Sequence, residues 1–535
     1  MDTDSQTVLR IVKSSACLVV IVLSLFIFSS SMSKKAVNDE HATCAAGVLL
    51  TKGKMIYRDF ACVAQMPYHP LLCAAVYRVL NTTYYLFSAR LLTVLCDILI
   101  VISIIGIFRH IFSAFPISGF LLGMAMATIC VFNGHFSRVS GFAINKDFMI
   151  FCVLVSFWLF ICTDFKRGSH YLRIGIISVL LTMACCMDFT AVFILLLFFI
   201  ILAVLRTGSV KARLKTIFVF LISPVIVLIL PVLIMLQSPH AFFINVFELP
   251  LLRMRLIHKM NLMRGETFFG QFVQILTYAT EPQGIFPFLV AICLIVLIIS
   301  GRRGLKIANP MNALLAVLVP VIFFLTALCT PIFLYEHFAK LVPFIIVSFA
   351  YPLLYLRNLE WGNPHKLFRI ASIVVAACTF SQAATQPLLE RTAIVFRPQS
   401  WVPIKIHQIS EEVAQRIKEP KLVVTLAPLY ALESGCDIYL ELSSGWDGCK
   451  IASVLPASKR EITKTLNPKT FRTMIEQRPP SGVVIDIDAK KDEVSSIGLV
   501  LLRIAKTRWP DPEYDENVWE RIEHESLGVV SYHRL

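Results

Sequence analysis

Eleven apolar runs dominate this chain, and they restrict its fold more than any other feature. They lie near residues 14–32, 84–107, 113–132, 147–163, 174–186, 189–205, 216–235, 284–300, 312–329, 341–356 and 370–385. Apolar residues make up 57% of the 535, which is too high a fraction for a water-soluble protein of this length. We therefore predict a polytopic α-helical membrane protein with about 11 transmembrane helices. The short runs 174–186 and 189–205 leave open one kinked pair or a re-entrant segment.

Lysine and arginine indicate which side of the membrane each loop faces. Every second loop is basic, starting with Arg109 after the second run, and cytoplasmic loops carry such an excess. This pattern predicts a cytoplasmic N-terminus, with the first run retained as an anchor, and an extracytoplasmic C-terminal tail. The outer side then receives the loops 33–83, 133–146, 236–283 and 330–340.

Two other classes of function fit the composition poorly. The formal net charge is +15, but the basic residues form short clusters between spans, without a basic helix or an aromatic-studded patch. We therefore expect no nucleic-acid partner. No C-x-x-C pair occurs among the 15 cysteines, most of which lie inside apolar runs, so a thiolate metal centre is not expected.

The chain divides near residue 387 into two parts. Residues 1–386 hold the spans, with the first outer loop 33–83 and a candidate lid in the loop 236–283. Residues 387–535 have the composition of a water-soluble domain, in which predicted strands such as "KLVVTLAP" and "GVVIDID" alternate with helices near 406–418, 468–476 and 493–507. We expect a small extracytoplasmic α/β domain. Whether Cys436 and Cys449 form a disulfide there stays open.

Acidic residues gather in the first outer loop. Two helices along the membrane surface are predicted there, from Asp39 to about Lys52 and from Pro70 to about Leu80. Asp39 has two interpretations: its carboxylate caps the first of these helices, or it serves as a general base or metal ligand at the membrane surface. The two roles are compatible. Asp188, between two short spans, is expected in a solvated turn.

The same loop resembles a known family. Its sequence, "NDEHATCAAGVLLTKGKMIYRDFACVAQMPYHPLLCAAVYRVL", is similar to the first outer loop of the GT-C membrane glycosyltransferases. The similarity is greatest to their bacterial branch, which is grouped with protein O-mannosyltransferases and the lipid A aminoarabinose transferase. The resemblance implies that Asp39 and Glu40 form the catalytic acidic motif. Supporting positions in this loop are Tyr57, Asp59 and His69.

Further motifs follow in the family's order. "SRVSGFAINKDF" resembles the second outer loop and places Arg138 and Asp147, whereas "YEHFAKLVPFIIV" resembles a late outer loop and places Tyr335 and His337. The tail "VVTLAPLYALESGCDIYLELSSG" is similar to the extracytoplasmic domain of some members. For Asp147, a structural ion pair with Arg138 or Lys146 is the alternative to a role in the site.

One difference from the family's pattern concerns the residue that would bind the phosphate group of the sugar donor. Related transferases often carry Lys-Pro-Pro-Leu where this chain has Tyr68-His69-Pro70-Leu71, so the phosphate-binding lysine is absent at that point. Cations elsewhere on the outer side would have to replace it. The candidates are Arg58, Arg138, Arg253, Arg255, His258 and Lys259, with Lys146, His337 and Lys340 also on that side.

The resemblance implies an enzyme of the bacterial cytoplasmic membrane. It would transfer a sugar from a polyprenyl-phosphate donor, with inversion, to an acceptor lipid, glycan or protein, with Asp39 as the base. Some members use a divalent cation, for which Asp39, Glu40 and His337 are candidate ligands. Two alternatives are a flippase for lipid-linked sugars and an inactive scaffold for envelope glycan assembly. A flippase predicts charges in mid-span, whereas these spans read as nearly charge-free apart from Asp97. The sugar, the acceptor, metal dependence and oligomeric state stay open.

Overall fold

The structure is a computed structural model of the whole chain. It describes residues 3–62, 66–165, 170–204, 209–255, 270, 273, 277, 310–328, 335–358, 393–452, 454–486, 519–524 and 529–534.

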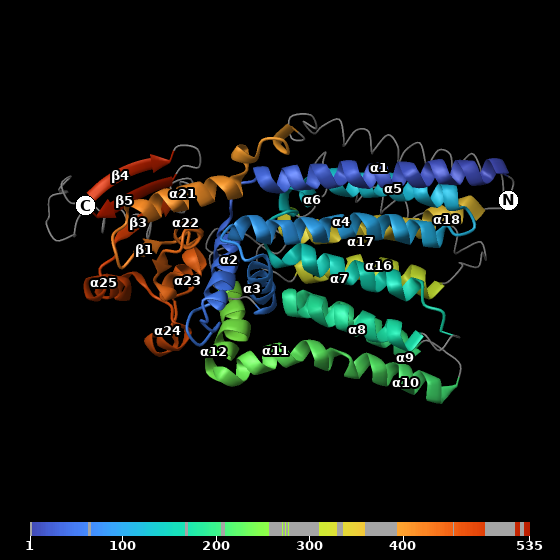
Figure 1. Cartoon of the computed structure of the whole chain (residues 1–535). Helices are drawn as coiled ribbons and strands as arrows, with labels where there is room; N and C mark the ends of the chain where they lie inside the picture. The colour runs from blue at the N-terminus through green and yellow to red at the C-terminus, as the bar shows by residue number, and fades with distance from the viewer. Residues whose placement is uncertain are drawn as a thin grey trace.

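Long apolar helices run side by side and form one bundle (Figure 1). They are α1 (Thr3–Ser33), α4 (Tyr85–Ile111), α5 (Pro116–Phe132), α7 (Asn145–Ile161), α8 (His170–Met187), α9 (Val192–Val204), α10 (Val210–Ile222), α11 (Pro224–Gln237), α16 (Pro310–Leu328), α17 (Tyr335–Ser348) and α18 (Ala350–Asn358). Within the described ranges, six helical segments are long and apolar enough to cross a membrane, and two shorter apolar helices accompany them. The chain is therefore a multi-pass membrane protein.

Nine of the eleven predicted spans coincide with these helices. The runs 284–300 and 370–385 lie outside the described residues, so the total of 11 stays a prediction. The two short runs are separate helices, α8 and α9, which are joined at Asp188 through the 3-10 turn η1 (Phe189–Ala191).

Close packing and lipid exposure both follow from the apolar sequence. A Cβ on Gly106 of α4 would lie 2.3 Å from the Trp158 ring of α7, so only glycine allows the two helices to approach this closely. Phe26 of α1 meets Phe132 of α5 edge to face, with 4.6 Å between ring centroids. At the opposite side of the bundle, α10 and α11 present large apolar side chains outward, as lipid contact requires.

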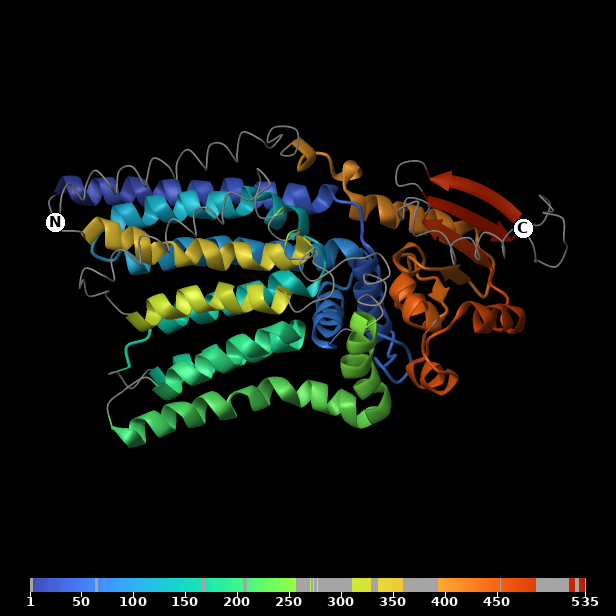
Figure 2. The ribbon, with the colours of Figure 1, turned by 180° about the vertical axis from the view of Figure 1, so that it is seen from behind.

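The two ends of the bundle differ. The N-terminus lies at one end, called the N-terminal end here, and the C-terminal sheet lies beyond the other, called the α2 end (Figures 1 and 2). Basic residues gather at the N-terminal end: Arg109 lies over the Phe120 ring, Lys215 over Tyr171 and Arg357 over Phe115. These residues belong to the loops for which the positive-inside pattern predicts a cytoplasmic position.

Short helices cover the α2 end. They are α2 (Asn38–Thr51), α3 (Tyr68–Leu80), α6 (Gly134–Val139), α12 (Pro239–Phe243) and the π-helix η2 (Ile244–Glu248). The first predicted surface helix thus forms within one residue of its expected bounds, whereas α3 begins two residues before Pro70. At Gly47 the two helices come so close that an added Cβ would lie 3.0 Å from the Cys73 Cβ.

The C-terminal region contains a five-stranded sheet in the order β2-β1-β3-β5-β4. The strands are β1 (Leu422–Thr425), β2 (Asp437–Ile438), β3 (Gly482–Asp486), β4 (Trp519–His524) and β5 (Val529–Arg534). β1 pairs in parallel with β2 and β3, and β5 pairs antiparallel with β3 and β4. The helices are α21 (Val402–Arg416), α22 (Leu429–Leu432), α23 (Gly445–Ala452), α24 (Ala457–Thr463) and α25 (Pro468–Gln477). The predicted helix 493–507 lies outside the described residues.

Alternation along the strands gives the sheet two apolar faces. Val424 and Val483 pack in a cluster with Phe471 of α25, whereas Val423 and Val484 pack on the other face. Cys436 and Cys449 belong to different clusters, and both thiols are free in the structure. The two cysteines therefore do not form a disulfide in this conformation.

The second of these faces is shared with the membrane part. One cluster joins β1, α21 and α22 to side chains of α2, α3 and α4: Cys44, Ala45, Val48, Cys73, Tyr77, Leu86 and Ala89. Ion pairs at the edge of this contact join Lys52 to Asp437 at 3.0 Å and Arg253 to Asp447 at 3.5 Å. The sheet domain is thus fixed to the α2 end of the bundle by a continuous apolar core.

Candidate active site

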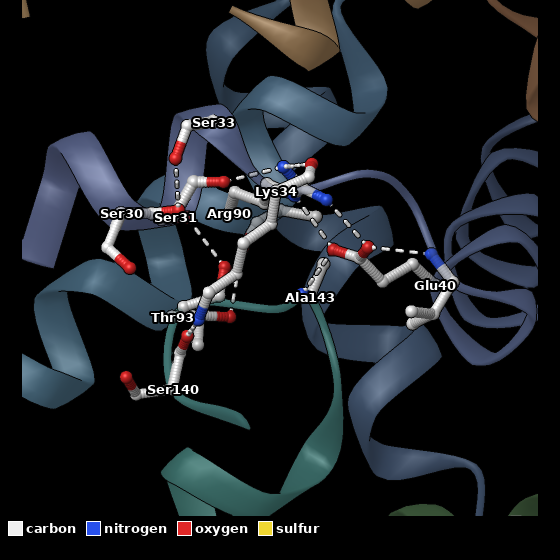
Figure 3. Close-up of polar contacts among 12 residues, drawn as sticks. Ser30, Ser31, Ser33, Lys34, Glu40, Arg90, Thr93, Ser140 and Ala143 are labelled. Carbon is white, nitrogen blue, oxygen red and sulfur yellow. Dashed lines mark hydrogen bonds and ion pairs between the residues drawn. The ribbon is translucent and has the colours of Figure 1, made fainter. Parts of the chain in front are cut away.

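A buried ion pair organises the α2 end (Figure 3). Glu40 on the first turn of α2 and Arg90 on α4 are both fully buried, and they meet in two parallel hydrogen bonds. Arg90 Nε donates to Glu40 Oε1 at 2.8 Å, and Nη2 donates to Oε2 at 2.7 Å. Such a fork-to-fork arrangement is the strongest geometry available to this pair of side chains.

Each partner also binds backbone groups of further segments. Arg90 Nη1 donates to the carbonyl oxygens of Ser31 (2.6 Å) and Lys34 (2.9 Å), at the end of α1. Glu40 accepts from Val37 N (3.2 Å) before α2 and from Ala143 N (2.7 Å) before α7. Three segments distant in sequence, residues 31–40, α4 and the loop before α7, are therefore held together by one charge pair.

Arg90 was missed by the sequence reasoning. The span 84–107 was read as charge-free apart from Asp97, yet Arg90 lies in it. An arginine inside a span is costly unless it is paired, so its position was a sufficient signal to look for a buried partner such as Glu40. Asp97 is itself fully buried on the same helix.

Asp39 precedes Glu40 but is placed differently. It is half-buried on the first turn of α2, and among the described residues it takes part in no hydrogen bond or ion pair. The expected capping role falls instead to Glu40, which binds the N-cap amide of Val37. The Asp39 carboxylate interacts electrostatically with Lys146 on α7. Its oxygens are therefore available to a ligand.

Two ion pairs lie at this end of the bundle, and Lys146 belongs to one of them. Lys146 pairs with Glu336 at the start of α17, and Lys340 on the next turn of α17 pairs with Asp188 between α8 and η1. The expectation of a solvated turn at Asp188 was wrong: its side chain is 15% exposed and also accepts from Thr190 Oγ1 at 2.7 Å. Together with Asp39, these residues form what we call the charged cluster (Asp39, Lys146, Asp188, Glu336 and Lys340).

Asp147 follows Lys146 on the first turn of α7. It is almost fully buried and accepts a hydrogen bond from Gly141 N at 3.2 Å, in the loop before α7. Gly141 has φ +81, and a Cβ there would lie 2.7 Å from Ser31 Cβ, so this loop can approach α1 only with glycine. Lys34 and Lys146 supply the positive charges that act on Asp147. Arg138 is exposed at the end of α6.

Lys34 completes the contact between α1 and this loop. Its ammonium donates to the carbonyl oxygens of Ser137 (2.7 Å) and Ser140, and lies 4.8 Å from the centre of the Phe142 ring. Burial lowers the pKa of Lys34 from 10.5 to about 8.

This shift in pKa predicts how Lys34 affects stability. Between pH 8 and 10.5 the folded protein has released the proton that the unfolded chain still binds. The contribution of Lys34 to the free energy of unfolding should therefore rise with pH in this range and stay constant below it. The melting temperature of the wild type, minus that of Lys34→Met, should increase from pH 8 to 10. Lys35→Met, at an exposed position, is the control, and a difference that stays flat or falls contradicts this assignment.

Three of the remaining first-loop candidates, Tyr57, Arg58 and Asp59, lie together in a turn between α2 and α3. Tyr57 is buried with φ 67 and packs edge to face on Phe242 of α12. Arg58 donates twice to Asp59, whose carboxylate also accepts from Met55 N at 2.7 Å. This pairing with Arg58 holds the pKa of Asp59 below its ordinary value. Arg58 is thus exposed, but its guanidinium is already paired with Asp59.

The other candidates are distributed around the same end. Burial lowers the pKa of His69 on α3 to about 4, so His69 is neutral near pH 7. Arg253 is held by Asp447 of the sheet domain, and Arg255 is exposed. Tyr335 begins α17 and His337 follows within its first turn. His258 and Lys259 lie outside the described residues, as does most of the predicted lid 236–283 beyond residue 255.

A metal site at Glu40 does not fit this geometry. Both Glu40 oxygens already accept two hydrogen bonds each, so a cation there would have to displace Arg90. Across the part of the chain that the structure describes, no group of three or more His, Cys, Asp or Glu side chains is placed to hold a metal ion.

The chain has the GT-C fold, as its likeness to solved structures of that fold over nearly its full length shows. The chain is similar to ArnT from Cupriavidus metallidurans bound to undecaprenyl phosphate, with a TM-score of 0.54 and 12% identity over 96% of this chain and 97% of that one. The apo state of ArnT gives a TM-score of 0.55 and 12% identity over 97% and 98% of the two chains.

An archaeal structure extends the likeness. The oligosaccharyltransferase AglB from Archaeoglobus fulgidus, in complex with an inhibitory peptide and a dolichol-phosphate, gives a TM-score of 0.50 at 10% identity. The similarity covers 98% of this chain and 74% of AglB. No protein-family model and no curated protein sequence matches the chain.

Proposed function

We propose that this protein is a glycosyltransferase that moves a sugar from a polyprenyl-phosphate donor to an acceptor outside the bacterial cytoplasmic membrane, with inversion at the anomeric carbon. The observation that carries the proposal is Asp39, a half-buried carboxylate without a hydrogen-bond partner among the described residues, beside the lysines of the charged cluster. The fold supports the class of enzyme. The lipid phosphates bound by ArnT and AglB support the class of donor.

The chemistry assigns a different role to each member of the site. The acceptor hydroxyl loses its proton to a carboxylate oxygen of Asp39 while its own oxygen attacks the anomeric carbon. The bond from that carbon to the phosphate oxygen breaks on the opposite side, and the polyprenyl phosphate leaves with the electron pair. Lys146 and Lys340 stabilise the charge that develops on this phosphate. Glu40, bound on both oxygens, positions the first turn of α2.

The location of the site agrees with this donor. Asp39 and the charged cluster lie where helices of the bundle meet α2 and α3, so a lipid can present its polar head while its chain stays among the spans (Figure 1). The basic N-terminal end of the bundle corresponds to the cytoplasmic side. We accordingly place the site and the sheet domain on the extracytoplasmic side.

Reconstitution tests the proposal directly. The purified protein in vesicles is supplied with a panel of polyprenyl-phosphate sugars and with envelope lipids, glycans and peptides as acceptors. We expect one carrier to be consumed, with the free polyprenyl phosphate and the glycosylated acceptor appearing in equal amounts. Movement of the intact carrier across the bilayer without its consumption identifies a flippase instead. If neither occurs with any carrier, the protein is a scaffold and the proposal fails.

Donor binding provides a prediction for the charged cluster. Lys146→Met removes one cation from the phosphate site, and we expect the KM for the donor to rise about tenfold, or about 1.4 kcal/mol of binding. Lys340→Met is made together with Asp188→Asn, so that no buried charge is left unpaired, and should act similarly. Lys52→Met, which removes an exposed lysine of the sheet contact, is the matched control. An unchanged donor KM in both cluster variants would rule out this phosphate site.

A further inference from the structure

The first turn of α4 has no cap of its own. Its N-cap residue is Tyr84, and no side chain of that residue bonds the free amides of the turn. The first amides of a helix have no acceptor within the helix and need one from elsewhere. The acceptor here comes from the sheet domain: Glu433 Oε1, at the end of α22, accepts from Leu86 N at 2.8 Å.

Contacts within the sheet domain hold Glu433 in this position. Its side chain is fully buried, where an ionised carboxylate is costly unless it is bound. The second oxygen, Oε2, lies 3.1 Å from Nδ1 of His407 on α21. The His407 ring in turn stacks on Tyr84, with 3.7 Å between ring centroids. A carboxylate at a helix N-terminus also complements the helix dipole.

The helix that Glu433 caps is the one that carries Arg90. Arg90 follows Leu86 by four residues, which is about one helical turn, or roughly 6 Å along the axis. Arg90 binds Glu40 directly, and Glu40 adjoins Asp39 on the first turn of α2. A series of direct contacts therefore leads from the sheet domain through α4 to the candidate base.

We propose that Glu433 is a positioning residue for transfer: by capping α4 it holds Arg90, and through Arg90 and Glu40 it holds Asp39 in register with the charged cluster. The sheet domain is then part of the catalytic unit rather than a separate binding module. This inference rests on the proposed function for its kinetic consequence, but its structural content does not depend on it.

Kinetics with the full-length protein test the role. Glu433→Ala is expected to lower kcat at least tenfold with little change in the donor KM, and Glu433→Gln, which keeps an acceptor oxygen, should recover part of the loss. Asp437→Ala is the matched control, because it removes an exposed carboxylate of the same interface that pairs with Lys52, and it should leave kcat within about twofold. If Glu433→Ala keeps the wild-type kcat, or if Glu433→Ala and Asp437→Ala reduce kcat equally, the inference fails.

Hydrogen exchange without substrate separates this inference from the proposed function. In Glu433→Ala we expect faster exchange of the amides at 85–90 and at 38–43, two segments far apart in sequence that Arg90 and Glu40 connect. Faster exchange confined to the sheet domain would show that Glu433 only stabilises its own domain. A wild type that consumes no carrier overturns the proposed function, while the exchange result still decides whether Glu433 controls the first turn of α2.

Discussion

Replacing Asp39 with Asn is expected to reduce sugar transfer by about 10²- to 10⁴-fold, the range that a general base contributes. Asn has the same shape but cannot accept the proton of the acceptor hydroxyl. Because Asp39 makes no hydrogen bond or ion pair within the described residues, the substitution should leave the fold, the melting temperature and donor binding unchanged. Initial rates in vesicles at saturating donor, alongside melting curves, measure both effects.

A matched control makes this result decisive. Asp164→Asn alters an exposed carboxylate at the N-terminal end of the bundle and should transfer sugar at the wild-type rate. An Asp39→Asn protein with more than a tenth of the wild-type rate would mean that another group removes the proton.

Breaking the Glu40–Arg90 pair is expected to have the largest effect on stability. Arg90→Met leaves the Glu40 carboxylate fully buried without its countercharge, which costs about 3–5 kcal/mol of the free energy of unfolding. The double variant Glu40→Leu with Arg90→Met removes both charges, and we expect it to regain much of that loss. It should not regain transfer activity, because the ends of α1, α2 and the loop before α7 lose their common partner.

In the double variant, the free energy of unfolding should therefore recover while the rate of sugar transfer stays low. Denaturant-induced unfolding in detergent measures the first, and initial rates in vesicles measure the second. Arg78→Met is the matched control, since Arg78 is exposed on α3 and makes one long hydrogen bond of 3.2 Å to Leu50 O. If the double variant is as unstable as Arg90→Met, the buried charge is not the cause. If it transfers sugar normally, the pair has no positioning role.

Several features of the fold were predictable because they depend on local sequence. A bilayer requires about 20 consecutive apolar residues for each spanning helix, and nine predicted spans coincide with described helices. The helix α2 was predicted from its amphipathic pattern and from Gly53, which has φ +80 just beyond it. The parallel strands β1 and β3 followed from β-branched runs between turn residues.

Predictions about individual side chains were less successful, because they depend on segments far apart in sequence. Asp39 and Glu40 are adjacent and were treated as one acidic motif. In the helix, successive side chains point about 100° apart, so Glu40 turns toward Arg90 while Asp39 interacts with Lys146. Asp188 was expected in a solvated turn because it lies between two short spans; its partner, Lys340, is 152 residues away in the sequence.

The sequence by itself thus determined the class of protein, the helices that form the bundle and the end of the bundle at which polar and acidic residues gather. These properties follow from hydropathy and from charge counts along each segment. Only the tertiary structure decided which acid is bound and which is available, and that a carboxylate of the sheet domain caps the helix carrying Arg90. A buried charge is stabilised by partners in three dimensions, and neighbouring positions in the chain do not specify those partners.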